Sequence, residues 1–177
     1  MRIRKLKLED AKYMLEWMHD ESVTKYLKKN FASLTIKDCE LFILNSLKAF
    51  DELKNNKSEC ISLNFAIASD NDEYQGSVSL KYVDFTNKRA EFAITTRSQS
   101  HGKGYSKFAM NWIMKYAFTH LNLNTVNWNC TTDNSRAFKF YLKNFGKVVD
   151  FYIDDSKKYD KALVQYSLNK NDFFRNR

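Results

Sequence analysis

Apolar residues recur along the chain at two different spacings, which predict helices in some segments and strands in others. Intervals of three and four residues over Glu9–His19 and from Ile36 to Phe50 predict two amphipathic helices. Between residues 61 and 96 the interval falls to two, as in half-buried strands. Polar turns at 69–73 and 87–88 divide this stretch, so it predicts an antiparallel meander of three strands.

The second half of the chain returns to a helical spacing. Lys107–His120 is apolar on nearly all sides, which predicts a helix buried in the core. The other expected elements are a first strand, a later strand, a helix and two final strands, at 2–6, 126–130, 134–145, 148–153 and 162–168. We expect the tail after Asn169 to be frayed, although Phe173 and Phe174 suggest some packing. A length of 177 residues without repeats or linkers predicts a single domain, 1–177, of the α/β (α+β) class.

The turn before the buried helix contains two of the four glycines in the chain, Gly102 and Gly104. It lies between a predicted strand and a predicted helix, an arrangement that aims free backbone N–H groups at an anion. Glycine also lets the backbone close on a phosphate without a Cβ in the way. The turn lacks the Lys–Ser/Thr pair of a P-loop and the third glycine of a dinucleotide-binding turn. We interpret it as a cradle for a diphosphate; the alternative is that both glycines are ordinary turn residues.

The net charge of +8 favours anionic ligands, either nucleic acid or a phosphorylated small molecule. Because the charge is spread along the chain, nucleic acid is the weaker candidate. Three distant cysteines without a C-x-x-C pair, and only three histidines, argue against a metal site and suit a reducing cytoplasm. The charged N-terminus is unlike a signal peptide, and no apolar run reaches membrane-spanning length. We therefore expect a cytoplasmic protein that contacts no membrane.

Three sequence blocks, which follow one another along the chain in the order found in the family, resemble the GNAT superfamily of acetyl-CoA-dependent N-acetyltransferases. The resemblance covers nearly the whole chain. The turn 101–106 is similar to the family's Arg/Gln–x–x–Gly–x–Gly/Ala loop, with His101 and Ser106 in place of the usual first and last residues. The block 134–146 matches the family's N-x-x-A-x-x-x-Y-x-K-x-x-G helix, although Lys147 replaces the phenylalanine that usually follows. The block 17–23 is similar to the opening of a branch that includes ribosomal-protein N-terminal and nucleotide-linked amino-sugar acetyltransferases.

The resemblance implies a mixed, mostly antiparallel central sheet, flanked by helices and splayed between the fourth and fifth strands. It implies acetyl-CoA as the co-substrate and no metal. The residues expected to hold the pyrophosphate through backbone amides are Gly102, Lys103, Gly104, Tyr105 and Ser106. The residues expected to contact the rest of the cofactor are Ile94, Thr95 and Thr96, which would pair with the pantetheine amides as an added strand does, and Asn134 near the gap.

By the same resemblance, Tyr141 is the general acid that protonates the leaving thiolate. A phenol of pKa about 10 can protonate a thiolate of pKa about 8.5 at modest cost; the alternative is a core tyrosine on an aromatic helix face. Glu91 lies on the strand face opposite Phe92 and is the candidate base. Since the pKa of an ammonium exceeds that of an ordinary glutamate by roughly 4–6 units, Glu91 needs a raised pKa or a water chain. The alternative is that Glu91 is a surface partner of Arg89 or Lys88.

The acceptor is expected to be the primary amine of a small molecule or of a peptide N-terminus. The segments expected to wall its side of the cleft combine aromatic rings with lysines: Trp17, Lys25, Tyr26, Lys28, Lys29 and Phe31, with Lys157, Lys158 and Lys161 in the last hairpin. Aromatic faces beside lysines suit a flat anionic acceptor such as a nucleotide-linked amino sugar, and would repel a polycation such as spermidine. The alternatives are that these lysines only solvate the surface, or that the chain is a CoA-binding module without catalysis. We expect a monomer or a homodimer.

Overall fold

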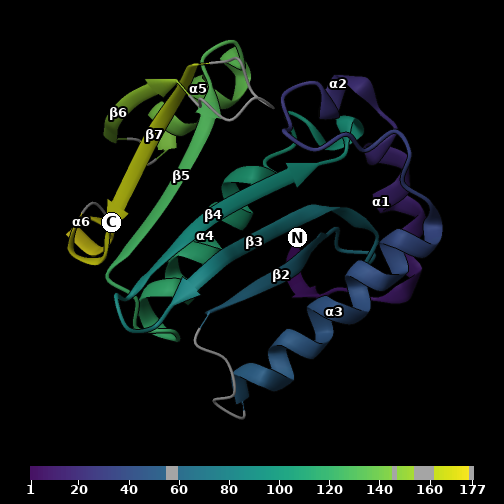
Figure 1. Ribbon diagram of the computed structural model, residues 1–177, viewed down its shortest axis with the longest axis horizontal. Helices are drawn as coiled ribbons and strands as arrows, with labels where there is room; N and C mark the ends of the chain where they lie inside the picture. The colour runs from purple at the N-terminus through teal and green to yellow at the C-terminus, as the bar shows by residue number, and fades with distance from the viewer. Residues whose placement is uncertain (55–59, 145–146, 154–161, 176–177) are drawn as a thin grey trace.

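The computed structural model describes residues 1–54, 60–144, 147–153 and 162–175. They form one seven-stranded sheet with the strand order β1-β2-β3-β4-β5-β7-β6 (Figure 1). The strands are β1 (Arg2–Lys5), β2 (Cys60–Ala68), β3 (Tyr74–Asp84), β4 (Arg89–Thr96), β5 (Thr125–Thr131), β6 (Lys147–Ile153) and β7 (Ala162–Asn169). Neighbouring strands are antiparallel except for the parallel pair β4 and β5. The predicted mixed, mostly antiparallel sheet is therefore confirmed.

Helices cover both faces of the sheet. They are α1 (Ala11–Met18), α2 (Glu21–Thr24), α3 (Ile36–Lys54), α4 (Tyr105–Thr119), α5 (Ser135–Asn144) and α6 (Lys170–Arg175), with short 3₁₀ helices η1 (Leu8–Asp10) and η2 (Ser98–Ser100). On one face, Met14 of α1 and Ile43 of α3 are buried in a cluster with Tyr74 of β3. On the other, Ile113 of α4 is buried in a cluster with Phe92 of β4. Among the described residues, no helix combines the length and apolar character that crossing a bilayer requires.

The last helix corrects one prediction. We expected the tail after Asn169 to be frayed, but α6 follows β7 directly. Phe173 of α6 is 1% exposed, and its ring centroid lies 5.4 Å from that of Phe118 on α4. Burial of such a side chain stabilises by about 1.5–3 kcal/mol, enough to dock a helix that is too short to be stable alone.

The sheet opens between its fourth and fifth strands. β4 and β5 pair over three residues only, Arg89–Glu91 with Thr125–Asn127. Beyond these pairs the two strands diverge (Figure 1), while β5 stays paired with β7 along its whole length. The edge of β4 that faces β5 therefore carries backbone N–H and C=O groups without a strand partner from Phe92 to Thr96. This confirms the predicted splay.

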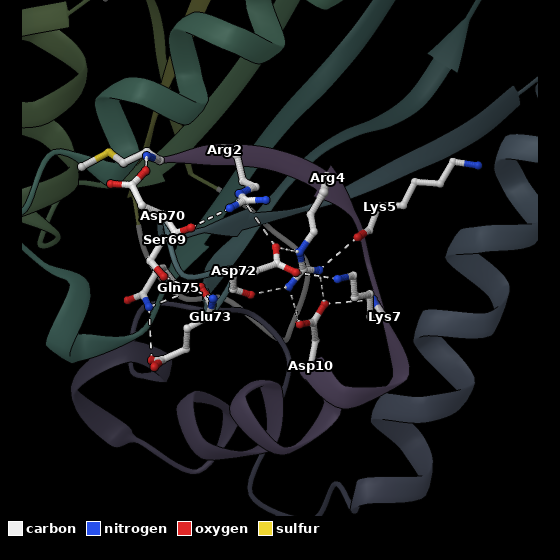
Figure 2. Close-up of polar contacts among 11 residues, drawn as sticks. Arg2, Arg4, Lys5, Lys7, Asp10, Ser69, Asp70, Asp72, Glu73 and Gln75 are labelled. Atoms are coloured by element: carbon white, nitrogen blue, oxygen red, sulfur yellow. Dashed lines mark hydrogen bonds and ion pairs between the residues drawn. The ribbon is translucent and has the colours of Figure 1, made fainter.

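Ion pairs fix the turn between β2 and β3 to the N-terminal strand (Figure 2). Arg4 donates from its two terminal nitrogens to both carboxylate oxygens of Asp10, at 2.7 and 2.8 Å, and from Nε to Asp72 Oδ1 at 2.8 Å. Hydrogen bonds from Lys7 and from Arg4 lower the pKa of Asp72 to about 2, so this carboxylate stays ionised. These contacts tie the turn to β1 at the start of β3. That part of β3 also contacts the loop before α4, because Arg97 N donates to Gln75 O at 3.0 Å.

Candidate active site

A cavity of about 920 Å³ occupies the gap between β4 and β5. Its walls are β4, part of β3 at residues 81–82, the turn before α4, the first turn of α4, the end of β5, Leu163 of β7, α5, and residues 23–31 between α1 and α3. Every predicted site residue except Lys103 lines it: Glu91, Ile94, Thr95, Thr96, Gly102, Gly104, Tyr105, Ser106, Asn134 and Tyr141. The splay of the sheet thus gathers into one place residues that come from separate blocks of the sequence.

The turn at Gly102 and Gly104 has the geometry of an anion-binding site. Both glycines have left-handed backbones, with φ of +75° and +85°, and Gly104 is the N-cap of α4. A Cβ added at Gly102 would meet no atom within 4 Å, so backbone conformation rather than crowding favours glycine there. The first amides of a helix have no acceptor within it, and no other described residue accepts a hydrogen bond from Tyr105 N or Ser106 N. With the helix dipole, these amides favour a phosphate at this end of α4.

Lys103 departs from the expected pattern. Its amide donates to Ser100 O at 3.4 Å, and the residue is exposed and lies outside the cavity lining. Its backbone N–H already has an acceptor, so it is less available to a phosphate than its neighbours. The helix begins at Tyr105, two residues earlier than the apolar pattern predicts, and this brings two further helix-terminal amides to the cavity.

Sequence reasoning does not single out Arg97, yet this residue anchors the phosphate turn. Its side chain is only 5% exposed and forms 2.7 Å ion pairs with Glu16 of α1 and with Glu73, just before β3. The guanidinium carbon lies 4.6 Å from the ring centroid of Tyr13, also on α1. The Arg97 carbonyl accepts a hydrogen bond from Ser100 N at 2.9 Å, at the start of the turn. One buried cation therefore joins the turn to two other parts of the fold.

Replacing Arg97 by methionine is expected to weaken both the fold and acetyl-CoA binding. Loss of the buried guanidinium should lower the free energy of unfolding by about 2 kcal/mol, because hydrogen bonds to charged groups contribute about 1.5–3 kcal/mol and the carboxylates left behind can be hydrated. The freed turn should raise the KM for acetyl-CoA about tenfold, with little change in kcat. Thermal unfolding and steady-state kinetics measure the two effects.

The matched control is Arg89→Met. Arg89 is 62% exposed and lies 3.5 Å from Asp84, and an exposed pair of this kind contributes about 0–1 kcal/mol. Equal effects of the two substitutions would show that Arg97 has no special part in holding the turn.

Ile94, Thr95 and Thr96 have strand partners on one side only. Each pairs with a residue of β3, and the opposite edge of all three faces the cavity. A molecule with successive amide groups, such as pantetheine, can hydrogen-bond to such an edge as an added strand does. The open edge of Ile94, Thr95 and Thr96 is therefore free to hydrogen-bond to the pantetheine amides, as the sequence predicts.

Tyr141 lies on α5 within an aromatic cluster and also lines the cavity. Its ring centroid is 5.3 Å from that of Tyr166 and 5.8 Å from that of Trp128, and the residue is 7% exposed. Burial raises the pKa of the Tyr141 phenol, and the nearby Cys130 and Tyr166 raise it further. Tyr141 therefore both packs in the core and reaches the cavity, so the two interpretations of this residue are compatible. Because its pKa is raised, the phenol stays protonated at neutral pH.

Asn134 is the residue before α5, and its side chain has a structural task. Its Oδ1 accepts a hydrogen bond from Ala137 N at 3.1 Å, which satisfies one free amide of the helix. The residue still lines the cavity, so its amide nitrogen remains as a donor toward a ligand.

Glu91 faces the cavity from the closed end of the splay. It pairs in register with Lys81 of β3 and Asn127 of β5, next to the point where β4 and β5 separate. Arg89, one of its expected surface partners, instead lies 3.5 Å from Asp84. Glu91 therefore lines the cavity next to the point where the two strands separate.

Thr131, at the end of β5, is a cavity residue that the sequence does not indicate. It is 2% exposed, and its hydroxyl has no hydrogen-bond partner among the residues that the structure describes. Buried polar groups normally have one, so this hydroxyl is available to a bound molecule.

A contact between His101 and Arg136 crosses from the phosphate turn to α5. The Arg136 guanidinium donates to His101 Nδ1 at 2.7 Å, and both residues line the cavity. Burial lowers the pKa of His101, and the charge of Arg136 lowers it further, which favours the neutral ring that can accept this hydrogen bond. The two residues are far apart in the sequence, and no local pattern signals the contact.

The cavity lining is strongly cationic. Of the residues expected on the acceptor side, Tyr26, Lys28, Lys29 and Phe31 line it, whereas Lys25 does not. Trp17 is buried and packs behind Phe31, with ring centroids 5.4 Å apart. Lys157, Lys158 and Lys161 lie outside the described residues. The cationic residues that line the cavity are Lys28, Lys29, Lys81, Lys107, Arg136 and Lys143, and Glu91 is the sole carboxylate among the described lining residues.

Comparison with known sequences gives a family match over most of the chain. The profile of the family described as acetyltransferase (GNAT) domain matches residues 1–144. The chain is similar to the uncharacterised N-acetyltransferase p20 of Bacillus licheniformis, with 26% identity over 166 residues, 85% of this chain and 89% of that protein. It is also similar to the spermidine N(1)-acetyltransferase of Escherichia coli K12, with 27% identity over 143 residues, 81% of this chain and 70% of that protein.

Comparison with solved structures supports the same fold. The crystal structure of spermidine N-acetyltransferase from Vibrio cholerae, in complex with CoA and spermine, superposes with a TM-score of 0.79. The match covers 98% of this chain and 97% of that chain, at 16% sequence identity.

Proposed function

The chain belongs to the GNAT family of acetyltransferases and is an N-acetyltransferase that uses acetyl-CoA, and on that premise we propose that its acceptor is the primary amine of a small, negatively charged molecule. The observation that carries the proposal is the charge of the cavity, because its described lining residues include six cations and a single carboxylate, Glu91. A cleft lined by one sign of charge concentrates ligands of the opposite sign. A nucleotide-linked amino sugar fits, because it joins an amine to a flat base and phosphates.

A polyamine is the second candidate, because relatives of this chain are spermidine acetyltransferases by name. Spermidine carries several positive charges, however, and the described walls of this cavity offer it one carboxylate. A peptide N-terminus should be intermediate in its attraction to the cavity, since the net charge of a peptide depends on its sequence. We therefore place the anionic acceptor first.

Each part of the cavity has a task in the proposed reaction. The amides of Gly104, Tyr105 and Ser106 hold the diphosphate of the co-substrate, and the open edge of β4 orients its pantetheine arm. Glu91 receives the proton of the acceptor ammonium through water, which leaves the amine free to attack the thioester carbonyl. The amine forms the amide bond as the carbon–sulfur bond breaks, and Tyr141 donates its proton to the departing thiolate. The second proton that the amine nitrogen loses then restores the Tyr141 phenol.

The raised pKa of Tyr141 is compatible with this task. Burial disfavours the anionic form of the phenol and of the thiolate alike, so both pKa values rise together in the same pocket. The gap between them, about 1.5 units for the unperturbed groups, is therefore not widened by burial alone.

A thiol-release assay with three acceptors tests the proposal. We expect turnover of a UDP-linked amino sugar to exceed turnover of a short peptide, and both to exceed turnover of spermidine. The charge reversal Lys29→Glu should lower kcat/KM for the nucleotide-linked acceptor about tenfold or more, because a new carboxylate faces its phosphates. Lys48→Glu on α3 is the matched control, since Lys48 does not line the cavity.

Preference of the wild type for spermidine would show that the sign of the charge argument is wrong. Failure to release thiol with any amine would favour the alternative of a binding module without catalysis.

A further inference from the structure

A bulge in β3 lies beside the candidate base. Lys81 pairs with Glu91 and Asp84 pairs with Arg89, so two residues of β3, Tyr82 and Val83, stand opposite one residue of β4. An extra residue of this kind bends a strand and re-aims its side chains. Here the two residues of the bulge point to different environments, because Val83 is fully buried whereas Tyr82 is 64% exposed.

Tyr82 adopts a backbone conformation that its side chain disfavours. Its φ is +50°, in the left-handed region that bulky residues seldom occupy. Its amide donates to Ser62 Oγ at 3.2 Å, which helps to hold the bulge in place. Burial of the ring does not offset the strain, because the ring is exposed and contacts no aromatic or cationic partner among the described residues. Strain that local packing does not explain is typical of functional positions.

The bulge turns Tyr82 toward the cavity, on the same side as the preceding residue, Lys81. Tyr82 and Lys81 both line the cavity that contains Glu91, Thr95 and Tyr141. Because Lys81 is the register partner of Glu91, the two side chains lie on the same face of the sheet, opposite Phe92 and the core. An acceptor whose amine reaches Glu91 therefore has an exposed aromatic ring and an ammonium group within the same chamber.

We propose that Tyr82 is the platform on which the base of a nucleotide-linked acceptor stacks, with Lys81 pairing with its phosphates. This inference rests on the proposed function and deepens it, since it names the part of the acceptor that the enzyme reads. A rigid, exposed tyrosine binds any planar base through its face, and an adjacent lysine adds charge attraction for phosphate. The bulge turns the ring out of the sheet to meet the ligand.

Three substitutions separate the ring from the backbone strain. Tyr82→Phe keeps the ring and should leave kinetics with a UDP-linked amino sugar nearly unchanged. Tyr82→Ala removes it and should raise the KM for that acceptor about tenfold or more, with kcat and the KM for acetyl-CoA unchanged. Tyr82→Gly should raise the acceptor KM equally but also raise the melting temperature, because glycine accepts a positive φ without strain.

Lys88→Gly is the matched control for strain. Lys88 also has a left-handed backbone, with φ of +52°, and is exposed in the turn between β3 and β4, outside the cavity lining. This variant should likewise be stabilised, while its acceptor KM stays that of the wild type.

Calorimetry with UDP on the CoA-saturated protein tests the platform without turnover. Saturation with CoA leaves the acceptor side as the place for UDP, and we expect binding by the wild type and Tyr82→Phe and at least tenfold weaker binding by Tyr82→Ala. Equal UDP affinity of the wild type and Tyr82→Ala, or an unchanged acceptor KM, overturns the inference. Binding of UDP that depends on Tyr82, without acetylation of any nucleotide-linked amine, would support the platform and count against the proposed reaction.

Discussion

Gly104→Glu is expected to abolish acetyl-CoA binding while the fold survives. Gly104 has a φ of +85°, is the N-cap of α4 and lines the cavity. A Cβ added there would lie 3.7 Å from Met1 Cε, so a glutamate at this position would stand beside the free amides expected to hold the diphosphate. Its carboxylate would repel the phosphates and compete for the same amides. Since hydrogen bonds to charged groups contribute about 1.5–3 kcal/mol each, loss of two or three should cost about 3–9 kcal/mol and weaken binding by at least about a hundredfold. Calorimetric titration with acetyl-CoA, beside circular dichroism, measures the result.

Gly104→Gln is the matched control for size and strain. Glutamine has the same length and imposes the same left-handed strain, which costs about 1–2 kcal/mol, but it carries no charge. We expect measurable binding that is weaker than that of the wild type. Binding of the wild-type strength by the glutamate variant would refute an anion site at this turn.

Tyr141→Phe is expected to lower kcat by about a hundredfold or more, the usual contribution of a general acid, while the KM for acetyl-CoA changes little. The hydroxyl is needed only when the thiolate departs, so its loss affects the transition state and not the binding of the co-substrate. Because burial raises the pKa of Tyr141, the wild-type kcat should show no fall due to its ionisation up to about pH 10. A pH series of kcat for both proteins tests this.

Tyr166→Phe distinguishes chemistry from packing. Tyr166 belongs to the same aromatic cluster, and burial raises the pKa of its phenol too, but it does not line the cavity. This control should keep nearly all of its activity. If the two variants are equally active, Tyr141 only packs.

The sequence predicted features that depend on neighbouring residues. The alternation of apolar residues placed β2, β3 and β4, and two glycines before an apolar run located α4 to within two residues of its start. A similarly local interaction caps α3, because Thr35 N donates to Asp38 Oδ2 at 2.8 Å at the start of that helix. Such features are visible because the interactions that produce them span only a few positions.

Features that depend on contacts between distant segments were missed. Arg97 looks like an ordinary surface cation until Glu16 and Glu73 are brought to it, and His101 acquires a partner only when α5 packs across the gap. The alternation of β3 gives no sign of the extra residue at Tyr82, since a bulge is decided by how two strands pair. The expected frayed tail failed for the same reason: the pocket for Phe173 is formed in part by α4, more than fifty residues earlier.

The three residue pairs that join β4 to β5 have a thermodynamic consequence. Strands β5, β7 and β6 are connected to the rest of the sheet through this short seam, so a molecule that fills the gap supplies cohesion that the polypeptide lacks there. A ligand bound only by the folded chain stabilises it by about 2.7 kcal/mol when present at a hundred times its Kd. The free energy of unfolding should therefore increase with the concentration of the co-substrate, because the bound molecule joins the two parts of the sheet.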